Sequence, residues 1–101
     1  MKYIIKYSKK AREDILNLTN HISFIYKAPT TSVKYMNELF RKINGLFESA
    51  ESYPLYNRKQ FSKHGLYVRR INYKKMAIIY TVHENTVLIQ RIIPGSVIIE
   101  T

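Results

Sequence analysis

The basic side chains between positions 58 and 75 are the feature of this sequence most able to do chemistry. No Asp or Glu lies among them, and the set comprises Arg58, Lys59, Lys63, Arg69, Arg70, Lys74 and Lys75. Cations without counterions predict a surface that binds phosphates or an acidic partner. The alternative is a row of solvated loop and turn side chains, of which Lys74-Lys75 is most simply a hairpin turn. The candidate residues for binding nucleic acid or another target are Lys63, Arg69, Arg70, Lys74 and Lys75.

Arg91 is the second such feature, because it interrupts the apolar run from Val87 to Ile93. A charge in an apolar strand is costly unless it is paired or reaches an open face. It either forms an ion pair with a helix carboxylate or belongs to a functional site. His64, beside Gly65 in the basic segment, is the histidine best placed to transfer a proton. The candidate catalytic residues are therefore Arg70, Arg91 and His64.

Other kinds of site have little support in the sequence. The three histidines, His21, His64 and His83, are scattered, and there is no cysteine, so no metal-ligand spacing occurs. Phosphate-binding and dinucleotide-binding glycine motifs are also missing. We expect no metal and no cofactor.

Length and charge limit the class of protein. The chain has 101 residues, which predicts one domain over 1–101, and Lys and Arg number 17 against 7 Asp and Glu, a net charge of +10. Such a charge favours polyanions or an acidic protein as partners. The apolar run near the N-terminus is too short for a signal peptide or a membrane span. We expect a cytoplasmic protein without a membrane partner.

Two amphipathic helices are expected after a first strand at 2–7. Ser8 is a suitable N-cap for a helix that runs to about Tyr26 and stops before Pro29. Its apolar stripe is Ala11, Ile15, Leu18, Ile22 and Ile25. Thr30, Thr31 and Ser32 offer caps for a second helix, whose stripe is Val33, Met36, Phe40, Ile43 and Phe47. One apolar face on each helix and a short connection predict an antiparallel helical hairpin that lies on a sheet.

The rest of the chain changes to a strand pattern. Residues 51–64 are expected to form a loop or an irregular strand, and strands are expected at 66–73, 76–82 and 86–93. Residues 96–101 are expected to be a short terminal strand or a tail. The order β-α-α-β-β-β predicts an α+β fold, with the N-terminal helical hairpin packed on one face of a small, mainly antiparallel sheet. The other face is expected to be open and to hold the functional site.

This order and several landmarks resemble the RelE/ParE superfamily across the whole chain. The landmarks are the opening strand and helix from Tyr3 to Ile15, Tyr53-Pro54-Leu55, Gly65 to Ile71, Ile78 to Val82, and the closing Val87 to Gly95. The resemblance implies the toxin of a bacterial type II toxin–antitoxin system. Members of the RelE type cut messenger RNA in the ribosomal A site, whereas members of the ParE type poison DNA gyrase.

The residues at the matching positions favour the ParE type. Arg70 falls where RelE-like members carry catalytic lysines, but Ala77 stands where they place an arginine. The tail after Gly95 has no Arg, His or Tyr. The catalytic residues of RelE-like ribonucleases are thus largely missing from this chain. Whether the chain is an enzyme stays open. Pro94-Gly95-Ser96 also departs from the basic or histidine motif that ParE-like members often carry there. A RelE-like ribonuclease with substituted residues and a degenerate, non-toxic binding module are the alternatives.

The resemblance also implies a cognate antitoxin, and hence a hetero-oligomer. We expect the antitoxin to contact residues 86–99 and the helical hairpin. Val97, Ile98 and Ile99 are expected to form an exposed apolar edge without such cover. The candidate partner-binding residues are Ile93, Val97, Ile98 and Ile99. Gyrase or the ribosome and its messenger RNA are the possible targets.

Overall fold

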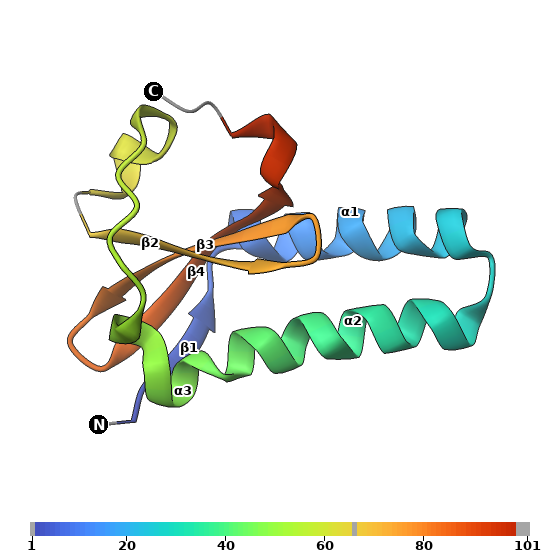
Figure 1. Cartoon of the computed structure of the whole chain (residues 1–101), viewed down its shortest axis with the longest axis horizontal. Coiled ribbons are helices and arrows are strands. Elements are labelled where there is room, and N and C mark those ends of the chain that lie inside the picture. The colour runs from blue at the N-terminus through green and yellow to red at the C-terminus, as the bar shows by residue number, and fades with distance from the viewer. Residues whose placement is uncertain (1, 66, 99–101) are drawn as a thin grey trace.

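A computed structural model gives the fold of residues 2–65 and 67–98 (Figure 1). The strands are β1 (Ile4–Tyr7), β2 (Val68–Tyr73), β3 (Met76–His83) and β4 (Thr86–Pro94). The α-helices are α1 (Lys9–Tyr26), α2 (Pro29–Asn44) and the single turn α3 (Leu46–Ser49). Three short 3-10 helices are η1 (Ala50–Ser52), η2 (Lys59–His64) and η3 (Gly95–Val97). None of the helices in these described ranges is long and apolar enough to cross a membrane.

The four strands form one mixed sheet in the order β1-β4-β3-β2. β2, β3 and β4 are an antiparallel meander, and β1 lies parallel to β4 at the edge. A parallel neighbour requires a long crossover connection, which α1 and α2 provide in this chain. The α+β arrangement, with a helical hairpin on one face of the sheet, confirms the fold predicted from the sequence.

α1 begins where the sequence predicts. The Ser8 side chain accepts a hydrogen bond from the Ala11 N–H at 3.0 Å, which satisfies one of the free donors of the first turn. Ala11, Leu18 and Ile22 are buried, and Ile15 is half-buried. The predicted stripe is wrong at Ile25, which is 52% exposed. The reason is visible in Figure 1, where the connected ends of α1 and α2 extend past the sheet.

α2 differs from the prediction at its start and in its buried face. Its N-cap is Ala28, Pro29 is the first helical residue, and no side chain caps the N-terminus, so the predicted caps are wrong. Ser32 instead donates to the Ala28 carbonyl. The buried positions are Ser32, Tyr35, Met36, Leu39 and Ile43, whereas Val33 and Phe47 are exposed. The predicted stripe is thus right at Met36 and Ile43 and wrong at Val33 and Phe47, while Phe40 is half-buried against the core. Tyr35 and Leu39 are the side chains that the sequence pattern failed to place in the core.

The main core lies between the helices and the sheet. Its sheet side chains alternate along β3 and β4 and include Ile78, Tyr80, Val87 and Ile89, all fully buried. The Tyr80 hydroxyl donates to the Ala50 carbonyl at 2.6 Å, which fixes the end of the helical segment against the middle of the sheet. Burying this hydroxyl with a partner avoids the cost of an unsatisfied polar group.

The other face of the sheet is covered, so the expectation that it is open is wrong. A second cluster of Phe61, Val68, Ala77, Ile79, Ile93 and Ile98 buries its centre. Phe61 comes from η2, and Ile98 follows η3. The Tyr56 N–H donates to the Val68 carbonyl, and Leu55 forms a bridge with Arg69, so part of the segment predicted as a loop or irregular strand pairs with β2. Residues 95–97 form η3 rather than a strand, and the remaining predicted tail, 99–101, lies outside the described residues.

Candidate functional site

A β-bulge in β4 sets the direction of Arg91. Ile79 pairs with Arg91 and Tyr80 pairs with Ile89, so Gln90 is an extra residue without a partner of its own in β3. A bulge of this kind shifts the alternation of side chains by one position. As a result Arg91 shares the far face with Ile79, and Ile92 returns to the core side. The Gln90 side chain stabilises the bulge by donating to the Thr81 hydroxyl at 3.1 Å.

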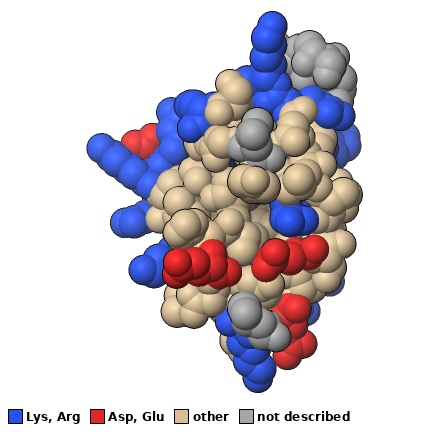
Figure 2. Space-filling view, turned by 90° about the vertical axis from the view of Figure 1, so that its left-hand side faces the viewer, with Lys and Arg blue, Asp and Glu red and all other residues tan. Residues whose placement is uncertain are grey.

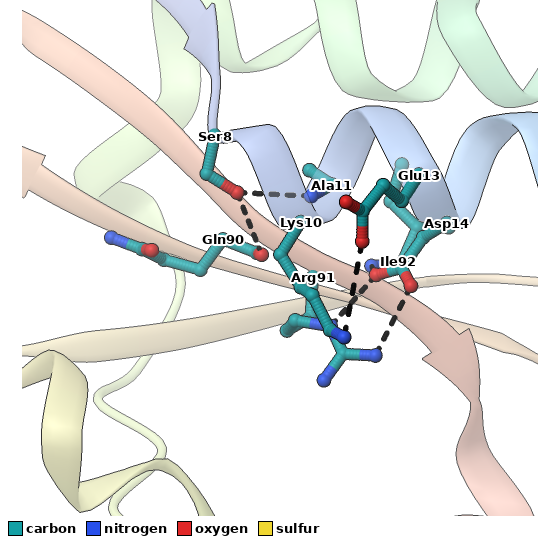
Figure 3. A network of polar contacts seen from close by, with 8 residues as sticks. All are labelled: Ser8, Lys10, Ala11, Glu13, Asp14, Gln90, Arg91 and Ile92. Carbon is teal, nitrogen blue, oxygen red and sulfur yellow. Dashed lines mark hydrogen bonds and ion pairs between the residues drawn. The ribbon is translucent and has the colours of Figure 1, made fainter.

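Asp14 of α1 is the partner of Arg91 (Figure 3). The guanidinium donates to the two carboxylate oxygens at 2.8 and 3.1 Å, and the Ile92 N–H donates to the Asp14 Oδ2 at 2.9 Å. The hydrogen bond to Asp14 raises the pKa of Arg91. Of the two alternatives left open by the sequence, the structure has the ion pair with a helix carboxylate. Asp14 thereby joins α1 to the end of β4 across the seam between the helix layer and the sheet.

A groove of about 1120 Å³ runs along this seam, between α1 and the end of the β2–β3–β4 meander. Its apolar lining includes Leu18, Ile22, Ile25, Met76, Ile92 and Ile93, with Tyr26 and Tyr35 towards the hairpin tip. Its basic lining consists of Arg70, Lys74, Lys75 and Arg91, and Asp14 is the acidic residue lining it. An apolar floor with a basic margin suits an amphipathic, acidic polypeptide segment.

Lys74 shapes one end of the groove through a strained turn. It is a non-glycine residue with a φ of 51°, in the two-residue turn between β2 and β3. Its Nζ lies 5.3 Å from the ring centroid of Tyr35 and 5.6 Å from that of Tyr73, a cation–π arrangement. The Tyr73 hydroxyl donates to Glu38 at 2.6 Å, and burial together with this hydrogen bond raises the pKa of Tyr73. These contacts hold the hairpin turn against α2.

Arg69 and Arg70 point to opposite faces of the sheet, as successive residues of a strand must. Arg70 donates to the Tyr56 hydroxyl and to the Asn72 side chain, both at 2.8 Å, and it reaches the groove. Arg69 faces the helix side, where it donates to the Tyr53 carbonyl, and its Nε is buried without a hydrogen-bond partner. The basic residues between positions 58 and 75 therefore do not form one surface.

His64 lies under partial cover near Arg91 rather than in the groove. Its Nε2 is buried and has no hydrogen-bond partner. Burial, followed by the nearby charges of Lys63 and Arg91, lowers the pKa of His64. A neutral imidazole is thus favoured at this position. Arg70 and Arg91 both line the groove, but His64 does not, so the three candidate catalytic residues do not share one cavity.

The residues predicted to bind a partner are divided by the structure. Ile93 and Ile98 are both 7% exposed, since they pack in the second cluster, so the expected apolar edge is wrong at Ile98. Ile93 still contributes to the lining of the groove. Val97 is exposed, and Ile99 lies outside the described residues. Lys63 is exposed on η2, apart from the residues that line the groove.

Three of the acidic residues lie at the end of the molecule away from the groove. Figure 2 shows the end of the molecule opposite the hairpin tip, where acidic side chains form a band and basic ones project around the margin. The elements at this end are α3, η1 and the β3–β4 turn, which contain Glu48, Glu51 and Glu84. The groove lies at the other end, where Asp14 pairs with Arg91 and Glu38 lies near Lys74. Within residues 2–65 and 67–98, no three His, Asp or Glu side chains gather in a way that could hold a metal ion.

Sequence reasoning covered part of the groove only as ranges. Residues 86–99 and the helical hairpin were predicted to contact an antitoxin, but no residue within them was singled out among Asp14, Ile25, Tyr26, Tyr35 and Ile92, which line the groove. The sequence could have indicated Asp14, because a charged residue in an apolar strand requires a partner and α1 carries carboxylates. The groove itself depends on how far the helical hairpin extends past the sheet, which periodicity does not report.

Comparisons with known proteins agree with this geometry. The family model described as the ParE toxin of the type II toxin–antitoxin system parDE matches residues 5–98. No curated protein matches the chain by sequence. A solved structure of the chromosomal ParDE toxin–antitoxin system from P. aeruginosa is similar with a TM-score of 0.74 and 16% identity, over 92% of this chain and 96% of that one. The toxin–antitoxin complex RelBE2 from Mycobacterium tuberculosis is similar with a TM-score of 0.60 and 14% identity, over 93% and 99%. The fold and the family match confirm the resemblance drawn from the sequence, and the chain belongs to the ParE toxin family of type II toxin–antitoxin systems.

Proposed function

We propose that this chain inhibits growth through a ParE-like action on DNA gyrase. The observation that supports it is the use of the candidate catalytic cations in structural contacts. Arg91 is paired with Asp14, and Arg70 is held by Tyr56 and Asn72. Cleavage of RNA by a RelE-like toxin would need an acid, a base and cations around one phosphate. Of the three candidates, Arg70 and Arg91 line the groove and His64 lies outside it, so the proposed base is separated from the cations.

The test is an assay with purified protein and DNA gyrase. We expect loss of supercoiling activity and accumulation of gyrase-bound, cleaved DNA as the toxin concentration rises. Messenger RNA in a reconstituted translation system should stay intact under the same conditions. Undisturbed gyrase together with codon-positioned transcript cuts would reject this target.

The second candidate is a ribosome-dependent ribonuclease, and one contact favours it. The Arg70 guanidinium and the Tyr56 hydroxyl are 2.8 Å apart, so a cation and a potential proton donor lie together. If these residues act on RNA, Arg70→Ala abolishes the transcript cuts while the gyrase assay stays negative. A third outcome, no toxicity on induction and no effect in either assay, would indicate a degenerate binding module.

We also propose that a cognate antitoxin neutralises the toxin by covering the groove. The apolar floor supplies surface to bury, and Arg70, Lys74 and Lys75 supply a basic margin for an acidic segment. Both structural relatives are toxin–antitoxin systems, which supports a partner of this class.

A matched pair of substitutions on α1 tests this interface. Ile25 is 52% exposed and lines the groove, whereas Leu16 is 62% exposed and does not. We expect Ile25→Asp to weaken antitoxin binding about a hundredfold, since a buried apolar anchor is lost and a charge like the partner's is added. Leu16→Asp should bind as the unmodified chain does, measured by calorimetry. Equal affinities for the two variants would place the antitoxin elsewhere.

A further inference from the structure

Within residues 2–65 and 67–98, the end of β4 is a sheet edge without a neighbouring strand. β1 pairs with β4 from Thr86 to Ile89 and then ends at Tyr7, where the chain turns into α1. β4 continues to Pro94, so the segment from Gln90 to Pro94 has β3 on one side only. An unpaired strand edge is a template on which another chain can add a strand.

The backbone of Ile92 is the group that such a strand would use. Its N–H points away from β3, towards Asp14. In an antiparallel ladder the N–H and C=O of one residue point to the same side, so the Ile92 carbonyl faces this edge too. Two copies of the segment, related by a twofold axis, could exchange both hydrogen bonds at this residue.

Side chains from the start of α1 occupy this edge instead (Figure 3). The Ser8 hydroxyl donates to the Gln90 carbonyl at 3.0 Å, and the Asp14 carboxylate accepts from the Ile92 N–H at 2.9 Å. Arg91 holds the carboxylate in place with two further hydrogen bonds. The Asp14 side chain is only 9% exposed, so an incoming strand would have to displace it from an ion pair.

We propose that Asp14 is an edge cap: its carboxylate takes the place of a strand beside Ile92 and prevents a second copy of this chain from pairing with β4. Other contacts are made at the two outer strands. Arg12 donates to the Tyr7 carbonyl at the end of β1, and the Leu55–Tyr56 backbone pairs with β2. At Ile92 the cap is one carboxylate, so its effect can be tested with one substitution. The proposal is independent of the toxin's target and of the antitoxin.

The test compares three variants by sedimentation equilibrium, with folding checked by the thermal transition. Asp14→Ala removes the cap and is expected to form dimers at concentrations where the unmodified chain is monomeric. Asp14→Asn keeps an oxygen that can accept from the Ile92 N–H, and it should stay monomeric. Glu13→Ala is the matched control, because Glu13 is 52% exposed and its ion pair is a 3.9 Å contact with Lys10 on the same helix. A folded, monomeric Asp14→Ala, or equal dimerisation of the Ala and Asn variants, would overturn the proposal.

Amide exchange in the unmodified protein gives a second measurement that needs no variant. We expect the Ile92 amide to exchange at least about tenfold more slowly than the amides of the exposed Glu84-Asn85 turn, because a charged acceptor holds it. In the monomeric form of Asp14→Ala, the Ile92 amide should lose that protection. The amides that form hydrogen bonds between β3 and β4 should keep theirs. If Asp14→Ala does not fold, the exchange rate of the unmodified protein decides: an Ile92 amide as fast as the turn amides would mean that no cap exists.

Discussion

The two faces of the sheet are covered by very different structures. On one face, α1 and α2 build a cluster of 16 buried residues among those described. On the other, an irregular segment with η2 and the residue after η3 bury a cluster of six. Regular helices place an apolar side chain on the sheet at every turn, whereas the irregular cover supplies single side chains such as Phe61 and Ile98.

This difference explains where a partner can bind. The irregular cover fills the centre of the far face. At its margins Arg70 bonds to Tyr56 of this cover, and Arg91 bonds to Asp14 of the helix layer. The helical hairpin, in contrast, extends beyond the sheet and leaves apolar side chains such as Ile25 without cover. The available surface is therefore the seam between the layers rather than a face of the sheet.

The strongest test of the comparison uses two neighbours in β3. Ile78 and Ile79 are both fully buried but point into the larger and the smaller cluster, respectively. We expect Ile78→Ala to lower the free energy of unfolding by about 4 kcal/mol and Ile79→Ala by about 2 kcal/mol, because an irregular cover can settle into the space left by the deleted atoms. Urea denaturation of both variants measures the difference. Equal losses would mean that the far-face cover is as rigid as the helix layer.

Buried hydroxyl groups give a smaller contrast between the faces. Tyr80→Phe leaves the buried Ala50 carbonyl without its donor, and we expect a loss of about 1.5 kcal/mol. Tyr56→Phe removes the contact with Arg70 on the far face, where water can replace it, and we expect less than about 1 kcal/mol. Thermal unfolding of the two variants compares them. The reverse order would show that the Arg70–Tyr56 contact is needed for the far-face cover.

The smallest effect concerns pH and His64. Burial and the charges of Lys63 and Arg91 lower its pKa in the folded state below the ordinary value of 6.5. As the pH falls, the unfolded chain therefore takes up a proton at His64 before the folded chain does. The stability contributed by the neutral imidazole is thus present at pH 7 and is lost as the pH falls through 6.5 towards the folded pKa. We expect His64→Gln to lose less stability than the unmodified chain between pH 7 and pH 5. His83→Gln, at the exposed end of β3, is the control substitution.

Part of the candidate site could be predicted from the sequence. Arg91 was identified because a charge in an apolar strand needs a partner, and Arg70, Lys74, Lys75 and Ile93 do line the groove. Arg69 was grouped with Arg70 although adjacent strand residues face opposite ways, so this error was avoidable. The bulge at Gln90 could not be deduced, because two successive polar residues in a strand are equally consistent with an edge, a bulge or a misplaced boundary.

The sequence by itself determined the order of the elements, the start of α1 at Ser8, the three strands of the meander and the family of the protein. The elements follow from caps, turns and periodicity, which act between residues close together in the chain. The family follows from the resemblance of the ordered landmarks to the RelE/ParE superfamily. Only the tertiary structure decided that Asp14 meets Arg91 and Ile92, that Phe61 and Ile98 cover the far face, and that the helical hairpin leaves a groove beside β4. Such contacts join segments distant in sequence, and their geometry depends on how whole layers pack, which no local pattern specifies.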